Sequence, residues 1–335
     1  QMKQWQIVGR EQIALRDVPV PEPGYDEVRV RVKACSFCSR TDLVYWKYYG
    51  LKPHCTGAHF GHEVAGVIEK VGPGVSGWKE GDRVFLRGPA RGGGFAEFCI
   101  ARTIALGRLP EALSFVEGAP AQQIPIAVHG TRKVQPGDRV VVFGAGSAGL
   151  AVTQMAHVRG AARVVTLDLY DNRLEIAKQL GADYTVNVRR EDPLEAVPRL
   201  LGARPDVCID VVGIPSVAGQ CVELVRAEGN VTIFGTYHVE HDATFSLLQW
   251  EIKAISMNMS NEGSPQTAAE AMRIAERLLG AGRLSTKEYI THVLSFEEVP
   301  KGLELLATSP LLVPEAEMPV DLPWNREVIK VVVEV

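Results

Sequence analysis

The 335-residue sequence has few cysteines, no long apolar run and little net charge. Six cysteines are too sparse for a secreted disulfide scaffold, which favours a reducing cytoplasm, where a cysteine pair is more often metal-binding or catalytic than bridged. No uninterrupted apolar run reaches the roughly 18 residues of a membrane helix, and the segment QMKQWQIVGREQ lacks the apolar core of a signal peptide. A net charge of −4 gives no reason to expect nucleic acid or an anionic membrane as a partner. We expect a globular, cytoplasmic protein.

Residues 1–125 have the pattern of an all-β unit with a few short helices. In PVPEPGYDEVRVRVK a proline-punctuated turn is followed by valines at alternate positions, and this period of two predicts a strand with one buried face. The segment EVAGVIEKVGPGVSGWKEGDRV, from Glu63 to Val84, repeats short valine-rich strands separated by Gly/Pro turns.

The pattern changes near Pro136 to strands that alternate with helices. A buried strand from Arg139 to Phe143 runs through GAGSAG into a helix, and a second strand, from Arg163 to Leu167, is followed by the helical segment NRLEIAKQL. Such βαβ units imply a doubly wound parallel sheet, which we assign to residues 126–263. Residues 264–335 contain the helical segment TAAEAMRIAERLLGAG, a proline-rich surface stretch and a final strand, and we expect them to complete the first unit.

The stretch GAGSAG follows a strand and starts a helix, as in dinucleotide-binding folds. The first glycine permits the tight turn, the second lets a pyrophosphate approach the backbone, and the third allows close packing of the helix on the sheet. Asp168 lies 19 residues beyond Gly149, at the end of the next strand, where a carboxylate binds the adenosine ribose and repels a 2′-phosphate. The predicted cofactor is therefore NAD, bound by Gly144, Ala145, Gly146, Ser147, Ala148, Gly149 and Asp168.

A second candidate site lies in CSFCSRTDLVYW, residues 35–46, and in GHE, residues 61–63. A thiolate from Cys38, an imidazole from His62 and a carboxylate from Glu63 would suit a catalytic zinc that keeps one position open. A lone cysteine or histidine is more often an ordinary packed side chain. Cys35 suits a small buried residue better than a metal ligand. His54, Cys55 and His59 lie in the loop KPHCTGAHF, where surface or pocket positions suit them better than metal ligation.

With this combination the sequence resembles the zinc-dependent medium-chain dehydrogenase/reductase family, which includes the alcohol and polyol dehydrogenases. The resemblance covers nearly the whole chain, because PGYDEVRVRVKACSFC, GHEVAGVIEKVGPGVSGWKEGDRV, GGFAEF, PGDRVVVFGAGSAG and LSFEEVPKGLELL follow in the family's order. It implies an α/β fold with a GroES-like all-β catalytic domain and a Rossmann NAD-binding domain. It also implies that Cys38 and His62 are zinc ligands and that Glu63 is a ligand or a partner of the ligands.

Two departures from the family pattern concern the proton. The family usually has two residues between the ligand cysteine and the next aspartate, but three precede Asp42 here. Thr41, by its place before the acid, is the expected proton relay, and Ser39 is its rival. Val44 occupies the place of a histidine that often carries the proton onward, so the proton needs another route.

A third departure concerns the remaining ligand. Relatives present a Glu or Cys seven residues before a histidine resembling His129, and this chain has Gln122 there. An amide oxygen is a weaker ligand than a carboxylate, so Glu63 is a candidate direct ligand, and Gln123 is an alternative to Gln122. Only FLRGPAR separates GDRV from GGGFAEF, which leaves out the four-cysteine lobe of many relatives. One catalytic zinc and no structural zinc are expected.

The resemblance also assigns substrate and cofactor positions. DLVYW is similar to the DVHYW of sorbitol-type polyol dehydrogenases, which places Trp46 near the substrate, with Tyr49 as a second candidate for the pocket wall. Arg173 and Lys330 match positions that contact the adenosine ribose and the pyrophosphate, although a solvated position is nearly as common for a single basic residue. The nicotinamide would lie at the sheet edge near Val212, Gly213 and Thr236.

The expected function is zinc-dependent hydride transfer between NAD and a secondary alcohol, whether a polyol, a sugar or an amino alcohol. One alternative is a zinc-free quinone or enone reductase of the same fold, which Gln122 leaves open and which Cys38 and His62 oppose. Another is a non-catalytic nucleotide-binding protein. The family further implies a homodimer or a homotetramer.

Overall fold

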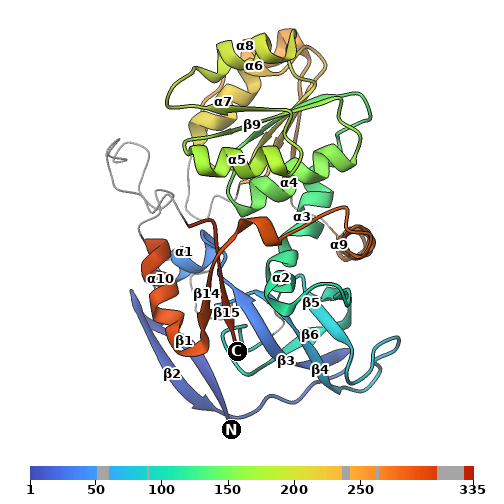
Figure 1. The fold of residues 1–335 in the computed structure, drawn as a ribbon, viewed down its shortest axis with the longest axis vertical. Helices are drawn as coiled ribbons and strands as arrows, with labels where there is room; N and C mark the ends of the chain where they lie inside the picture. The colour runs from blue at the N-terminus through green and yellow to red at the C-terminus, as the bar shows by residue number, and fades with distance from the viewer. Residues whose placement is uncertain (51–59, 89–90, 236–241, 261–263, 308–327) are drawn as a thin grey trace. The chain divides into compact units, whose positions relative to one another are not determined.

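The computed structural model describes residues 1–50, 60–88, 91–235, 242–260, 264–307 and 328–335 (Figure 1). The chain divides into two units, each described here by itself. Unit 1 comprises Gln1–Pro125, Met272–Gly282 and Thr286–Val335, and unit 2 comprises Ile126–Ala271 and Arg283–Ser285. Some residues singled out in the sequence lie outside the described ranges, namely His54, Cys55, His59, Thr236 and the proline-rich stretch 310–324.

Unit 1 is built mainly from β-strands, as its alternating valines predict. Among the described residues, a seven-stranded sheet has the order β14-β15-β3-β4-β5-β7, with β6 paired to β3 off this path, and a separate sheet joins β1 to β2. The strands are β1 (Met2–Gly9), β2 (Gln12–Val18), β3 (Glu27–Ser36), β4 (Glu63–Val71), β5 (Arg83–Leu86), β6 (Phe98–Arg102), β7 (Leu106–Arg108), β14 (Ile290–Ser295) and β15 (Lys330–Glu334).

Strand β3 lies at the centre of the unit 1 sheet. Val28, Val30 and Val32 are all buried in the core of the unit, so apolar burial holds the strand in register. On one side β3 pairs with β4, and on the other the C-terminal strand β15 pairs with its last residues, setting Val332 opposite Ser36. The end of the chain therefore lies beside the segment that leads to Cys38.

Short helices connect these strands. A capping box between Ser114 and Glu117 starts α2, which leads through a 3₁₀ turn to Gln122 and Gln123. The helices and turns are α1 (Thr41–Lys47), η1 (Thr103–Ala105), α2 (Phe115–Gly118), η2 (Ala119–Gln122), η3 (Lys287–Tyr289), η4 (Phe296–Glu298) and α10 (Val299–Ala307), while α3 (Gln123–Gly130) and α9 (Pro265–Gly280) have residues in both units. None of the helices in the described part of the chain is long and apolar enough to cross a membrane.

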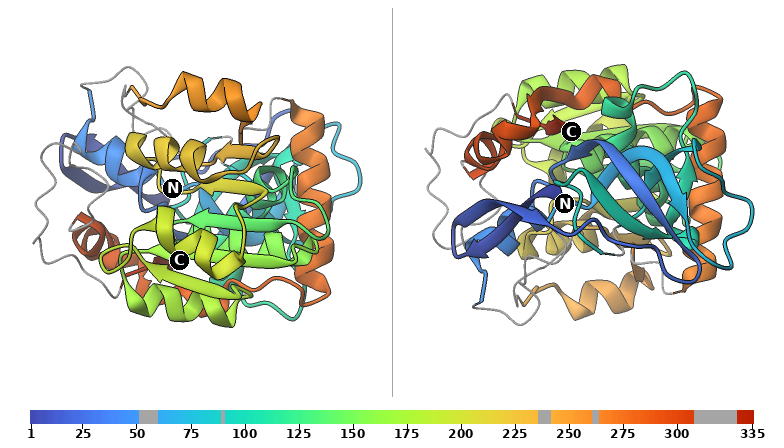
Figure 2. Two further views of the ribbon diagram at one scale, coloured as in Figure 1. Left: turned by 90° about the horizontal axis from the view of Figure 1, so that it is seen from above. Right: turned by 90° about the horizontal axis from the view of Figure 1, so that it is seen from below.

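Unit 2 is a parallel sheet with helices on both faces, the yellow ones opposite the green ones in Figure 2. In the described residues its six strands have the order β10-β9-β8-β11-β12-β13, which is the order of a doubly wound Rossmann sheet. The predictions of a mainly β first unit and of a doubly wound parallel sheet in the second unit are thus confirmed. The elements are β8 (Arg139–Phe143), α4 (Ser147–Val158), β9 (Arg163–Asp168), α5 (Asp171–Gln179), β10 (Tyr184–Asn187), α6 (Pro193–Leu201), β11 (Val207–Asp210), α7 (Pro215–Leu224), β12 (Asn230–Ile233), α8 (Leu247–Lys253) and β13 (Ser256–Met259).

Candidate active site

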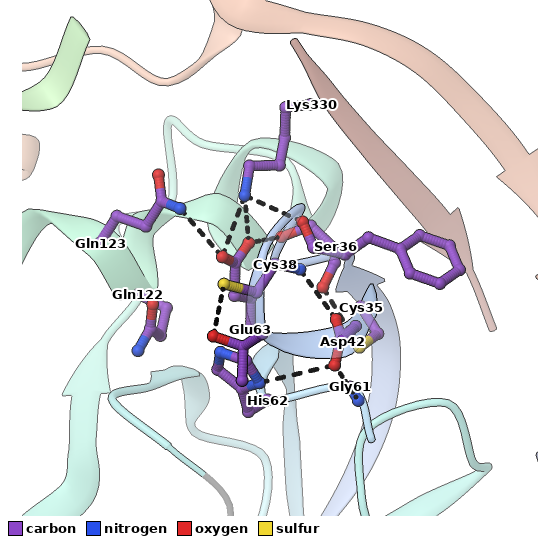
Figure 3. A network of polar contacts seen from close by, with 12 residues as sticks. Cys35, Ser36, Cys38, Asp42, Gly61, His62, Glu63, Gln122, Gln123 and Lys330 are labelled. Carbon is purple, nitrogen blue, oxygen red and sulfur yellow. Dashed lines mark hydrogen bonds and ion pairs between the residues drawn. The ribbon is translucent and has the colours of Figure 1, made fainter. Parts of the chain in front are cut away.

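The structure brings Cys38, His62 and Glu63 together in unit 1 (Figure 3). One candidate ligand atom from each residue (a sulfur, an imidazole nitrogen and a carboxylate oxygen) lies within 4.8 Å of the other two. Strand pairing explains this meeting, because the antiparallel register of β3 and β4 sets Ser36 opposite Glu63. Cys38 follows β3 and His62 precedes β4, so both residues lie at the same end of the strand pair.

The three donors are those that a catalytic zinc takes from a protein, with a fourth position left for substrate. Burial opposes ionisation of the Cys38 thiol, but the charge of His62 and a hydrogen bond with it outweigh burial, so the pKa of Cys38 is lowered. Burial likewise lowers the pKa of His62, and the charge and hydrogen bond of Cys38 outweigh it and raise that pKa to about 10. Without a metal the pair therefore favours a thiolate beside an imidazolium. The thiolate is the form of cysteine that binds metal, and ligation by His62 would release the proton of its ring.

Asp42 joins the two ligand segments, a role that the sequence analysis did not assign. Its carboxylate accepts hydrogen bonds from the backbone N–H groups of Cys38 (2.8 Å) and Gly61 (3.2 Å). Its Oδ1 lies 3.7 Å from Nδ1 of His62, so its charge faces that ring. Burial raises the pKa of Asp42 to about 6, although the His62 charge and the two N–H groups lower it. An acid four residues beyond a ligand cysteine, in the first turn of a helix, is the signal that could have identified it.

The glycine of GHE is required by its surroundings. Gly61 has a φ of 73°, in the left-handed region that favours glycine. A Cβ at this position would lie 2.8 Å from the backbone nitrogen of Phe95 and 2.9 Å from Sγ of Cys35. Any larger residue would therefore displace the N–H group that bonds Asp42.

Glu63 is fully buried among polar partners. The ammonium of Lys330 donates to both carboxylate oxygens, at 2.9 Å to Oε1 and 2.7 Å to Oε2. The Gln123 amide nitrogen donates to Oε1 at 3.0 Å, and the Ser36 hydroxyl donates to Oε2. Direct ligation of a metal by Glu63 would therefore change an existing buried ion pair.

Lys330, which the family resemblance assigns to a cofactor contact, is buried inside unit 1. Its side chain and that of Glu63 both have 0% exposure, and its third hydrogen bond goes to the carbonyl oxygen of Phe37 at 3.0 Å. Pairing of β15 with β3 puts the ammonium beside Glu63. In this arrangement all three protons of the ammonium are used inside unit 1. A contact of Lys330 with the cofactor stays a prediction.

The two glutamines that the sequence proposed as ligands are bonded differently. Gln122 donates its Nε2 to the carbonyl oxygen of Arg87 at 2.7 Å, which leaves its Oε1 as the atom for ligation. Gln123 donates to Glu63 instead. Figure 3 shows both side chains near the Cys38–His62–Glu63 cluster. Membership of either amide in a ligand set stays a prediction.

Thr41, the expected proton relay, has a hydrogen bond with the cluster. The Cys38 sulfur and the Thr41 hydroxyl are hydrogen-bonded at 3.2 Å, and Thr41 is the first residue of α1. Ser39 is partly exposed and precedes the helix. Trp46 and Tyr49 are partly buried and pack against the hydrophobic core of unit 1, and their role in a substrate pocket stays a prediction.

The glycine stretch of unit 2 links the end of β8 to the start of α4. Gly144 has a φ of 100°, which a tight turn requires and glycine permits. A Cβ on Gly149 would lie 1.9 Å from the carbonyl oxygen of Gly144, whereas a Cβ on Gly146 would have nothing within 4 Å. The loop is therefore closely packed against α4 and open at Gly146, at a helix N-terminus that favours anions.

Other predicted cofactor residues lie at the carboxyl ends of the unit 2 strands. Asp168 ends β9 and accepts hydrogen bonds from the backbone N–H groups of Ala145 (2.7 Å) and Tyr170 (3.1 Å), so its carboxylate faces the glycine loop. The Arg173 guanidinium lies 5.2 Å from the ring centre of Tyr170. After β11, the N–H groups of Val212 and Gly213 both donate to Asp210.

Two family models match the two parts of the chain. The model of the alcohol dehydrogenase GroES-like domain matches residues 24–119, and that of the zinc-binding dehydrogenases matches residues 147–277. The chain belongs to the zinc-dependent medium-chain dehydrogenase family. It is therefore an oxidoreductase, and the family resemblance expected from its motifs is confirmed.

Relatives of this dehydrogenase match over nearly their full length. Sorbitol dehydrogenase of Homo sapiens is 28% identical over 343 residues, covering 89% of this chain and 93% of that protein. L-threonine 3-dehydrogenase of Bacillus subtilis is 29% identical over 321 residues, with 87% and 91% covered. Among solved structures, alcohol dehydrogenase TADH from Thermus sp. ATN1 has a TM-score of 0.83 at 26% identity, with 100% of each chain covered. The 2R,3R-butanediol dehydrogenase of Bacillus subtilis, at 22% identity, TM-score 0.82 and 100% of each chain covered, shares the fold.

Proposed function

We propose that this dehydrogenase transfers hydride between a secondary alcohol and NAD with the help of one zinc ion per chain. The observation that carries the proposal is the meeting of Cys38, His62 and Glu63, whose candidate ligand atoms lie within 4.8 Å of one another. The relatives support the substrate class, because their names include a sorbitol dehydrogenase, a D-xylulose reductase and an L-threonine 3-dehydrogenase. The substrate would be a polyol, a sugar or an amino alcohol, oxidised in unit 1 with the cofactor held by unit 2.

The zinc would be held by Cys38, His62 and Glu63, with Gln122 as a candidate fourth ligand. When bound, it supplies a Lewis acid that polarises the substrate oxygen. The chain's own groups prepare the site, because the buried Asp42 carboxylate faces the His62 ring and accepts the backbone N–H of Cys38. The short connection between β5 and β6 has no cysteines, which supports a single zinc and no structural one.

Direct assay of the full-length protein tests the proposal. NAD-dependent oxidation of a panel of secondary alcohols that includes sorbitol, xylitol, threonine and 2,3-butanediol should proceed, stop after treatment with a chelator, and return when zinc is added. Turnover of quinones or enones by the chelator-treated protein would support the zinc-free reductase instead. Binding of NADH with no turnover of any alcohol would indicate a non-catalytic protein.

Thr41 would relay the proton of the substrate hydroxyl, accepting it while passing its own hydroxyl proton on toward the cofactor ribose and water; the support is the contact of its hydroxyl with Cys38. Thr41→Val keeps the shape of the side chain and removes the hydroxyl, so kcat should fall about 100-fold or more, as for loss of a general acid–base group. Ser39→Ala is the matched control and should stay close to wild type. Zinc content is measured in both variants, and a Thr41→Val enzyme that is zinc-loaded and fully active would exclude this role.

Asp168 would select NAD by bonding the adenosine ribose. Asp168→Ser should raise KM for NAD about 10- to 100-fold, because a hydrogen bond to a charged group contributes about 1.5–3 kcal/mol, and it should shift the preference toward NADP. Asp183→Ser is the control, because Asp183 also bonds a backbone N–H of β9, that of Val164. The ratio of kcat/KM for the two cofactors is the readout, and an unchanged ratio in Asp168→Ser would contradict the assignment.

We further propose that units 1 and 2 act as the catalytic and NAD-binding domains and that the protein is a cytoplasmic homodimer or homotetramer. The support for an oligomer, besides the family, is a set of exposed apolar side chains on α8, the helix that precedes the edge strand β13 in the chain. Leu247, Leu248 and Ile252 are each more than 60% exposed. Sedimentation of the purified full-length chain at micromolar concentration should give at least twice its mass of 36.5 kDa.

A further inference from the structure

The bonding around Glu63 is incomplete in one respect. Among the described residues, two buried neutral groups that interact with the Glu63 carboxylate each have a polar atom without a hydrogen-bond partner. One is an acceptor, Oε1 of Gln123, and the other is a donor, the hydroxyl of Tyr289. Gln123 is 8% exposed and Tyr289 is fully buried, so neither atom is supplied by bulk water. Since an unpaired buried polar atom costs stability, a second bonding arrangement at this site would explain why the amide oxygen of Gln123 is retained.

Gln123 and Lys330 are neighbours because they bond the same atom. Nε2 of Gln123 lies 3.0 Å from Oε1 of Glu63, and Nζ of Lys330 lies 2.9 Å from that oxygen. An amide carries its donor nitrogen and its acceptor oxygen on one carbon, so a half-turn about the last side-chain bond exchanges them. From one position, Gln123 can therefore offer an N–H to a carboxylate or a carbonyl oxygen to an ammonium.

We propose that Gln123 is a positioning residue that holds the Lys330 ammonium when Glu63 turns a carboxylate oxygen to the metal. This inference rests on the zinc site proposed above. In the arrangement seen here, Lys330 and Gln123 both donate to Glu63. When Glu63 gives an oxygen to the metal, Lys330 loses an acceptor in a place with 0% exposure, and the turned amide of Gln123 supplies the replacement.

The chemistry of the side chain explains why glutamine suits this place. A leucine would fill much of the same volume but would leave the ammonium short of an acceptor, so it would oppose the metal-bound arrangement. A glutamate would pair with Lys330 permanently and would repel Glu63 toward the metal. The two substitutions should therefore change zinc affinity in opposite directions, which a role in packing alone would not produce.

The test is zinc affinity of the full-length, metal-stripped protein, measured by competition with a chromophoric zinc chelator. Gln123→Leu should bind zinc about 10- to 100-fold more weakly than wild type, the usual cost of losing a group that supports a metal ligand. Gln123→Glu should bind zinc at least as tightly as wild type. Gln154→Leu is the matched control, because this buried glutamine of unit 2 bonds Ser285 through both amide atoms and should leave zinc affinity unchanged.

The outcomes separate this inference from the proposed function. A wild-type protein that binds no zinc would overturn the zinc site itself. Wild-type binding with Gln123→Leu within threefold of it would overturn the role of Gln123 alone, and so would a Gln123→Glu variant that binds more weakly than wild type. Circular dichroism of each metal-stripped variant shows whether it is folded. If Gln123→Leu does not fold, the comparison of Gln123→Glu with wild type still decides.

Discussion

Replacement of Cys38 by alanine should abolish zinc binding and lower kcat/KM for alcohol oxidation by about 1,000-fold or more, since the metal's polarisation of the substrate oxygen is worth several kcal/mol. The substitution removes the one thiolate of the cluster and the partner that sets the protonation of His62. Steady-state kinetics with NAD and the best alcohol of the panel, together with zinc analysis of the same sample, measure both effects.

The control for this experiment is a second cysteine of the same sheet. Cys99 lies in β6, outside the Cys38–His62–Glu63 cluster; it is fully buried, and burial raises the pKa of its thiol to about 12. Cys99→Ala should keep its zinc and should differ from wild type in kcat/KM by less than about threefold, because it removes only one buried sulfur. A Cys38→Ala enzyme with full zinc content or near-normal kcat/KM would show that the cluster is not the catalytic centre.

Replacement of Lys330 by methionine should destabilise the metal-free protein by about 3–5 kcal/mol, the typical cost of removing one partner of a buried ion pair. Methionine has a similar length but no charge, so the variant leaves the Glu63 carboxylate in a place with 0% exposure and without its cation. Chemical denaturation of the metal-free protein, followed by circular dichroism, measures the loss.

A second substitution shows where the loss comes from. In Lys330→Met/Glu63→Gln the stranded charge is gone, so most of the lost stability should return, as expected for residues that interact directly. Zinc should also restore part of the stability of the single variant, because its charge would take the place of the ammonium beside Glu63. A loss below about 1 kcal/mol in Lys330→Met, or no recovery in the double variant, would contradict the buried pair as the organising interaction of the site.

The elements that the sequence predicts well are those with a local cause. The alternating valines of β3 require one buried face, and the structure buries all three. The strand predicted from Arg139 to Phe143 is β8, with the same bounds. A short apolar run that ends at a glycine turn is typical of a buried strand of a parallel sheet. Cys38 and His62 are recognisable for a similar reason, since Cys38 lies two residues after β3 and His62 directly precedes β4, and both strands have a clear pattern.

The parts that the sequence did not predict depend on pairing between distant segments. Lys330 donates to Glu63 across 267 positions of sequence, and only the pairing of β15 with β3 brings the two together. One sign was present, because a lysine within the apolar run VIKVVVEV must either be exposed or find a buried partner. The contact of Gln123 with Glu63 had no local sign in the sequence, which offered Gln123 only as an alternative ligand to Gln122.

The measurement that tests the account most directly is the zinc content per chain of wild-type protein purified without added metal or chelator. About one zinc per chain, as expected of one catalytic site with Cys, His and Glu donors, would support the single metal centre at Cys38, His62 and Glu63. A value near zero that added zinc does not raise would contradict it, and Cys38 and His62 would then be ordinary packed residues of a zinc-free reductase or of a non-catalytic nucleotide-binding protein.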